Sequence, residues 1–166
     1  AADTLRFLTE SLKPAIEGEL NLPADPRRHA LIGYSLGGLT ALWILYQTAQ
    51  FCLCASCSGS FWYDGWVEYA ASRAPAGPCD VFLSLGLREE KSRNAKLAAV
   101  GEATRRTHAI LLDRPGVRAE MAWHEGGHFD GVPDRLARAI SRMIHASRPP
   151  PPGSGGEEPH SHPNAN

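Results

Sequence analysis

Residues 33–38 read Gly-Tyr-Ser-Leu-Gly-Gly, a G-x-S-x-G-G pattern between a strand-like run at 29–32 and an apolar, helix-like run at 39–46. A serine on a strand-to-helix turn needs small neighbours, because the chain reverses sharply and side chains beside it would clash. The helix that follows points its first amides at any negative charge that develops beside the serine. The pattern therefore predicts a nucleophile elbow, with Ser35 as the nucleophile and the amide of Leu36 as the first oxyanion donor.

The same pattern also occurs by chance at turns whose serine is buried and hydrogen-bonded. The strand-like and helix-like flanks favour the elbow over that alternative. The elbow hypothesis in turn requires that later segments of the chain supply a histidine and an acid.

Strand-like and helix-like segments alternate over residues 3–146. The predicted strands are 27–32, 51–58, 80–85 and 117–123, and the predicted helices are 3–17, 39–48, 66–74, 94–106 and 133–146. Strands that alternate with helices imply a parallel sheet wound with right-handed crossovers. We therefore expect an α/β fold in which helices flank a four-stranded parallel sheet.

The first and last helices carry apolar residues at helical spacing. In the first helix the stripe is Leu5, Leu8, Leu12 and Ile16, and Pro14 is expected to bend or end the helix. In the last helix we expect an inward face of Leu136, Ile140, Met143 and Ile144 and an outward face of Arg135, Arg138 and Arg142.

The composition restricts the classes of function. The chain has 166 residues, 43% of them hydrophobic, and a formal net charge of -1 without a dense Lys/Arg run, so a nucleic acid is not an expected partner. No apolar run approaches the roughly 20 residues of a membrane span, and we expect a cytoplasmic protein without a membrane partner. Residue 1 is not methionine and the first segment reads as the middle of a helix, as in a fragment of a longer protein.

One domain is expected over residues 1–147. From residue 148 the chain is a proline run followed by Gly, Ser, Glu, His and Asn, without one large apolar side chain. Such a segment has too little apolar surface to pack, so residues 148–166 are predicted to be a disordered tail.

Four cysteines, Cys52, Cys54, Cys57 and Cys79, include a C-x-C-x-x-C cluster that is compatible with a metal site or disulfides. Residues 51–57, however, read as a strand in which cysteine acts as a small apolar residue. Neither a second C-x-x-C pair nor a nearby histidine completes a zinc site. We therefore expect buried cysteines and no bound metal.

Four segments together resemble a known family. They are GYSLGG at 33–38, SGSFWYD at 58–64, LSLG at 83–86 with glutamates nearby, and GGHFDGVP at 126–133. The order of serine, acidic loop and Gly-His loop resembles the second half of the α/β-hydrolase fold. Within it, the chain over residues 3–146 is similar to bacterial esterases related to the siderophore esterases that hydrolyse enterobactin, salmochelin and bacillibactin.

The resemblance implies roles for particular residues. Ser35 matches the nucleophile and His128 the catalytic base, with His124 as the competing histidine. Glu89 best matches the acid and Glu90 is the next candidate, although both could belong to a solvated charged face. The resemblance also allows a Ser-His dyad, so an enzyme without the acid is a further alternative.

The function implied is that of a serine carboxylester hydrolase that acts on a small-molecule ester without metal or organic cofactor. Tyr34 and Trp62 are expected to contact the substrate, while packing beneath the loop is the alternative for Trp62. The same elbow would also suit an acyltransferase. A catalytically inert partial domain that only binds a partner is the alternative from another class.

Members of the resembled family have about four further strands before the nucleophile strand, and a loop among them supplies the second oxyanion amide. By that resemblance the chain lacks this donor and part of the substrate pocket. The strand at 29–32 should then lie at a sheet edge, where unpaired backbone groups favour self-association.

Overall fold

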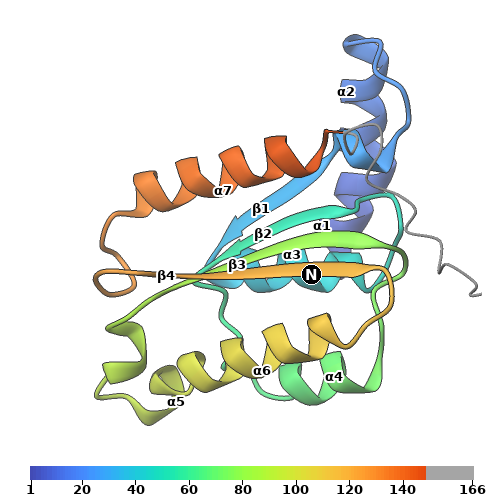
Figure 1. Ribbon diagram of the computed structural model, residues 1–166. Coiled ribbons are helices and arrows are strands. Elements are labelled where there is room, and N and C mark those ends of the chain that lie inside the picture. Colours follow the sequence, from blue (N-terminus) through green and yellow to red (C-terminus); the bar gives the residue numbers. More distant parts are fainter. Residues whose placement is uncertain (149–166) are drawn as a thin grey trace, which may run out of the picture.

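The computed structural model describes residues 1–148, and its central feature is a parallel sheet of four strands (Figure 1). The strands, in their order across the sheet, are β1 Ala30–Tyr34, β2 Leu53–Cys57, β3 Cys79–Gly86 and β4 Val117–His124. The predicted α/β class and the number of strands are therefore confirmed. The predicted tail lies outside the described residues, apart from Arg148.

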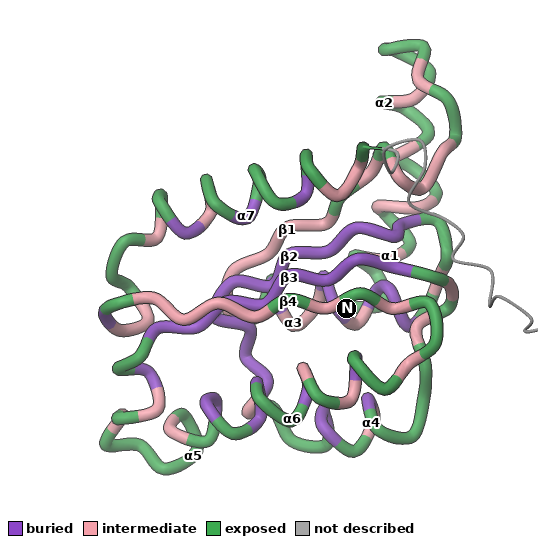
Figure 2. Tube along the Cα trace, in the orientation of Figure 1, coloured by how far each residue is buried: buried purple, intermediate pink, exposed green. Residues whose placement is uncertain are grey.

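The two central strands are the most buried part of the sheet. Every residue of β2 and β3 is buried, whereas β1 and β4 are mostly half-buried (Figure 2). Small and apolar side chains allow the central strands to be covered on both faces. Within the described part of the chain β1 pairs only with β2, so the predicted edge position is confirmed for residues 30–32.

The helices cover the two faces of the sheet unequally (Figure 1). The connections between successive strands lie on one face and contain α3 Leu36–Leu45, α4 Trp66–Ser72, α5 Ala95–Ala98 and α6 Val100–Leu112. The helix α7 Val132–Ala146 crosses the other face and packs mainly on β2 and β3. Right-handed crossovers between strands that follow one another in order place all the connections on one face of the sheet.

No helix within residues 1–148 is both long and apolar enough to cross a membrane.

The N-terminal helix is not continuous. It consists of α1 Ala2–Phe7, a π-helical turn Leu8–Leu12, and α2 Lys13–Glu19. Leu5 and Leu8 pack against the core, but Leu12 and Ile16 are 38% and 39% exposed. The predicted stripe is only half buried, because the π turn changes the helical phase and α2 projects away from the sheet (Figure 1). Pro14 lies in the first turn of α2, where its missing N–H is tolerated, and it does not end the helix.

The first strand begins later than predicted. Residues Pro26–Arg28 form a 3-10 turn instead, capped by the Asp25 carboxylate, which accepts a hydrogen bond from the Arg27 amide at 2.9 Å. The strand then continues to Tyr34, which brings its carboxyl end directly to the serine motif.

The last helix presents a different face to the sheet from the one predicted. Arg135, Ala139 and Met143 are buried, whereas Ile140 and Ile144 are 48% and 52% exposed. The exposed isoleucines lie beside the edge strand β1, and the sheet described over residues 1–148 has no further strand there. Leu136 and Met143 pack inward and Arg138 and Arg142 are exposed, as predicted. The prediction was wrong for Arg135, Ile140 and Ile144, because spacing identifies an apolar stripe but not the element that covers it.

The four cysteines are free and buried on or next to β2 and β3, as predicted. Burial raises the pKa of the Cys79 thiol to about 12, so it stays protonated at neutral pH. Among the residues described, no group of three His, Cys, Asp or Glu side chains is placed to hold a metal ion.

Candidate active site

Ser35 lies on the turn between β1 and α3 in a strained backbone conformation, with φ 57° and ψ -123°. The neighbouring glycines make this turn possible. A Cβ on Gly33 would lie 2.1 Å from the carbonyl oxygen of Gly37, and one on Gly38 would lie 2.7 Å from Oγ of Ser56. Gly37 itself has open space at that position, so two of the three motif glycines are required by sterics. The turn leaves the Ser35 side chain half-buried at the carboxyl end of the sheet.

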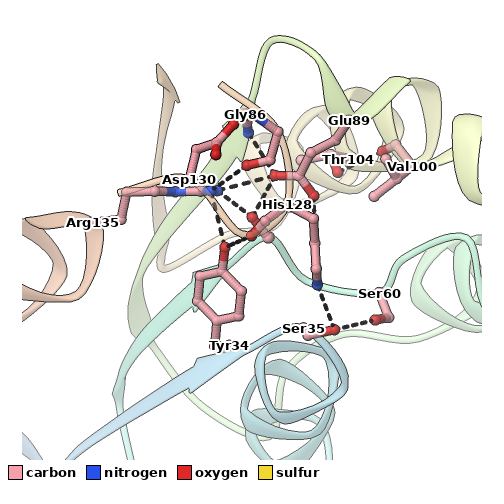
Figure 3. A network of polar contacts seen from close by, with 12 residues as sticks. Tyr34, Ser35, Ser60, Gly86, Glu89, Val100, Thr104, His128, Asp130 and Arg135 are labelled. Atoms are coloured by element: carbon pink, nitrogen blue, oxygen red, sulfur yellow. Dashed lines mark hydrogen bonds and ion pairs between the residues drawn. The ribbon is translucent and has the colours of Figure 1, made fainter. Parts of the chain in front are cut away.

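A continuous series of hydrogen bonds connects Ser35 to two residues from distant segments (Figure 3). Nε2 of His128 lies 3.1 Å from Oγ of Ser35, and Nδ1 of the same ring lies 2.7 Å from Oε2 of Glu89. Ser35 follows β1, Glu89 lies on the 3-10 turn Glu89–Lys91 after β3, and His128 lies on the loop after β4. The segments meet because parallel strands end at the same edge of the sheet.

Glu89 is a buried carboxylate whose two oxygens have different partners. Oε2 faces His128, while Oε1 accepts hydrogen bonds from Oγ of Ser58 at 2.6 Å, the Gly86 amide at 2.8 Å and Nη2 of Arg135 at 3.1 Å. Burial raises the pKa of Glu89, and this is the largest single effect, but the hydrogen bonds together outweigh it. The pKa of Glu89 therefore lies below its usual value, and the carboxylate is ionised at neutral pH.

The competing candidates point elsewhere. His124 ends β4 and lines a different cavity, and its Nε2 is buried without a hydrogen-bond partner among residues 1–148. Burial, with the nearby charges of Arg135 and Arg138, lowers the pKa of His124. Glu90 turns toward α6, where its Oε2 lies 2.9 Å from Nη2 of Arg105. Neither residue contacts Ser35.

A cavity of about 350 Å³ opens beside Ser35. Trp62 lines this cavity, and so does the highly exposed Phe129. Phe61, by contrast, is buried and stacks on Trp66 with the ring centroids 5.6 Å apart. The loop after β2 therefore divides its aromatic residues between the core and the cavity wall.

Leu36 directly follows the candidate nucleophile and is the first residue of α3. The amide of a first helical residue has no acceptor within its own helix, so it is available to a ligand. Its position beside Ser35 is that of the oxyanion donor expected from the sequence.

Tyr34 does not line the cavity. Its hydroxyl donates to the backbone carbonyl of His128 and accepts a hydrogen bond from Nη1 of Arg135 at 3.0 Å (Figure 3). The side chain at the end of β1 points toward α7, and Tyr34 supports the histidine loop in place of the expected substrate contact.

Three residues at the site were not identified from the sequence: Ser58, Ser60 and Arg135. Oγ of Ser60 lies 3.3 Å from Oγ of Ser35, and Ser58 bonds to Glu89. The only sequence signal for the two serines is their place after the carboxyl end of a strand, where parallel sheets bind ligands. Arg135 gave no signal, because it is one of several arginines on the last helix.

A model of the family described as "Putative esterase" matches residues 1–129. The uncharacterized protein YbbA of Bacillus subtilis (strain 168) is 31% identical over 113 residues, which are 66% of this chain and 45% of YbbA. The ferri-bacillibactin esterase BesA of the same organism is 26% identical over 157 residues, 87% of this chain and 52% of BesA. The chain spans about half the length of these curated relatives.

Solved structures share the fold. The enterochelin esterase from Shigella flexneri superposes with a TM-score of 0.68 at 22% identity, covering 86% of this chain and 37% of that one. The siderophore hydrolase EstA from Aspergillus nidulans superposes with a TM-score of 0.61 at 20% identity, covering 89% and 59%. The expected α/β-hydrolase-like fold is therefore confirmed.

Proposed function

The chain belongs to the Esterase family, and we propose that it hydrolyses carboxylic esters through an acyl-enzyme formed on Ser35. The observation that carries this proposal is the hydrogen-bonded series from Ser35 through His128 to Glu89, which opens on a cavity. A weak hydroxyl nucleophile needs an imidazole to take its proton, and the imidazole needs an anion to orient it.

In the proposed reaction, an oxygen lone pair of Ser35 forms a bond to the ester carbonyl carbon while Nε2 of His128 takes the hydroxyl proton. The carbonyl π electrons move to the oxygen, and the amide of Leu36 stabilises that oxyanion. The intermediate then collapses, the bond to the alkoxy oxygen breaks, and the imidazolium protonates the departing alcohol. Water repeats the sequence on the acyl-enzyme, which releases the acid and restores Ser35.

The substrate that we propose is a small-molecule carboxylic ester, and a siderophore ester is the natural candidate to test first. The similarity to BesA and to the enterochelin esterase supports this choice. The cavity combines apolar surface from Trp62 and Leu97 with the polar side chain of Arg88, whose guanidinium pairs with Asp130 at 2.8 Å. It therefore suits an ester that is partly apolar and partly polar.

The direct test is the reaction with p-nitrophenyl acetate. We expect an initial release of p-nitrophenol equal to the enzyme concentration, since acylation of Ser35 precedes the slower release of acetate. Mass spectrometry of protein quenched during this phase should place the acetyl group on the peptide that contains Ser35. Folded protein that releases p-nitrophenol no faster than buffer would contradict the proposal.

Glu89→Gln should reduce kcat by about 10³- to 10⁴-fold, the effect of forcing the wrong histidine tautomer. The donors around Oε1 would hold the new carbonyl oxygen there, which turns the amide NH₂ toward Nδ1 of His128. Nδ1 must then accept a hydrogen bond, so the proton of the neutral ring faces Ser35. Steady-state kinetics with p-nitrophenyl acetate measure the loss.

Glu90→Gln is the matched control, because Glu90 pairs with Arg105 and not with the histidine. We expect it to keep nearly full activity. Glu89→Gln also leaves the buried Arg135 without its anion, at a cost of roughly 3–5 kcal/mol in the free energy of unfolding, so circular dichroism must first show that the variant is folded. If both variants kept full activity, the hypothesis of a triad would have to be replaced by that of a Ser-His dyad.

We also propose that the chain self-associates through the free edge of β1. Backbone groups on that edge are unpaired within the described residues, and the exposed Ile140 and Ile144 lie beside it. Light scattering after size exclusion should give a mass above that of one chain, and Ile144→Lys should lower it. Leu112 is an exposed apolar residue at the end of α6, so Leu112→Lys is the control that should leave the measured mass unchanged. A wild-type monomer would contradict this proposal.

A further inference from the structure

Arg135 is a buried cation in the first turns of α7. Its side chain is only 3% exposed, and it lies beneath the loops that carry the candidate triad. A charge is taken out of water at high cost unless it is paired and hydrogen-bonded. Its neighbours on the outer face of the helix, Arg138 and Arg142, keep their charges exposed. The contacts of Arg135 therefore indicate what this buried charge does.

The guanidinium has two groups of partners, one for each terminal nitrogen (Figure 3). Nη2 donates to Oε1 of Glu89 at 3.1 Å and to Oγ of Ser58. Nη1 donates to the hydroxyl of Tyr34 at 3.0 Å and reaches the carbonyl oxygen of Gly127 at 3.4 Å. One side chain thus contacts segments that follow or belong to all four strands.

These partners are next to, or part of, the proposed catalytic residues. Tyr34 immediately precedes Ser35, Gly127 immediately precedes His128, and Glu89 is contacted directly. Tyr34 adds a second connection, since its hydroxyl donates to the His128 carbonyl.

We infer that Arg135 is a positioning residue, whose planar fork holds Glu89 and the backbone beside Ser35 and His128 in the arrangement that the proposed reaction uses. The inference rests on the proposed function. Because Nη2, Ser58 and the Gly86 amide all donate to Oε1, the carboxylate presents Oε2 to Nδ1 of His128. That contact fixes the ring with its Nδ1 protonated and with Nε2 free to accept the proton of Ser35.

The fork explains why the residue is arginine and not lysine. A guanidinium can bond to two groups in different directions through fixed nitrogens, whereas an ammonium is a single point charge on a flexible stem. Arg135→Lys keeps a cation for Glu89 but loses either the contact with Glu89 and Ser58 or the contact with Tyr34 and Gly127. Arg135→Met removes both sets of contacts and the charge.

The experiment measures kcat and KM separately for p-nitrophenyl acetate in Arg135→Met, Arg135→Lys and the exposed control Arg138→Met. We expect kcat to fall by about 100-fold in Arg135→Met, the size of effect that a small misplacement of catalytic groups produces, with little change in KM. Arg135→Lys should lie between this variant and wild type, and Arg138→Met should match wild type. If Arg135→Met does not fold, Arg135→Lys retains the buried cation and carries the test.

Two further readouts separate positioning from general damage. In the double variant Arg135→Met/Glu89→Gln, the loss in kcat should be close to that of Glu89→Gln alone, because the two residues act as one unit. The deshielded proton between Nδ1 of His128 and Glu89 should be visible by proton NMR in wild type and in Arg138→Met, and lost in Arg135→Met.

Folded Arg135→Met or Arg135→Lys with wild-type kcat would overturn the inference, and so would losses that multiply in the double variant. Failure of the proposed function gives a different result, since Ser35→Ala would then hydrolyse the ester as fast as wild type. The NMR signal does not depend on catalysis, so its retention in Arg135→Met would overturn the inference even in that case.

Discussion

Ser35→Ala should remove nearly all ester hydrolysis, with a loss in kcat on the order of 10⁶-fold as for other triad serines. The variant removes the only atom that bonds to the substrate in the proposed reaction. The fold should be unaffected. Alanine also carries a Cβ, so the strain at φ 57° is the same as for serine, and the smaller side chain fits the turn. Hydrolysis of p-nitrophenyl acetate by purified protein measures the loss.

Ser72→Ala is a suitable control, because Ser72 is an exposed serine at the end of α4, remote from the cavity. It should hydrolyse the ester like wild type. Equal turnover by Ser35→Ala and wild type would end the Ser35 hypothesis, whatever the ranking of the other variants.

His128→Ala should lose nearly as much activity as Ser35→Ala, because Oγ of Ser35 has no other base within hydrogen-bonding distance among the described residues. The double variant Ser35→Ala/His128→Ala should be little worse than either single one, since members of one catalytic unit are strongly non-additive. The same ester assay, with circular dichroism as the test of folding, measures all three proteins.

His124→Ala and His145→Ala are the matched histidine controls. His124 faces a separate cavity and His145 is exposed on α7, so both should retain most of the activity. A large loss in His124→Ala together with an active His128→Ala would move the base to His124.

Most of the fold could be predicted from the sequence, because strand and helix signals are local. The alternation of apolar runs gave the strands, and the parallel arrangement followed from the helices between them. The errors arose where another element decides the outcome. Arg27 and Arg28 lie in a 3-10 turn, capped by Asp25, where a strand was expected. Ile140 and Ile144 lie beside the edge strand, outside the described core.

For the candidate site, too, some residues could be predicted from the sequence and others could not. Ser35, Glu89 and His128 stand in motifs whose spacing and order are recognisable, and the structure places them in contact. The supporting residues have no such motif, because Arg135 acts through contacts with segments that are distant in the chain. The role of Tyr34 also depends on packing against α7, which the local sequence around the elbow does not specify.

The most direct test of the central claim, that Ser35 is an activated nucleophile, is labelling of the folded protein with a fluorophosphonate. The reagent needs only an activated serine, so the measurement does not depend on the natural ester. We expect one adduct, located by peptide mass spectrometry on Ser35, absent from Ser35→Ala and formed far more slowly in His128→Ala. Folded wild-type protein that forms no adduct, or that is labelled equally in His128→Ala, would contradict the claim.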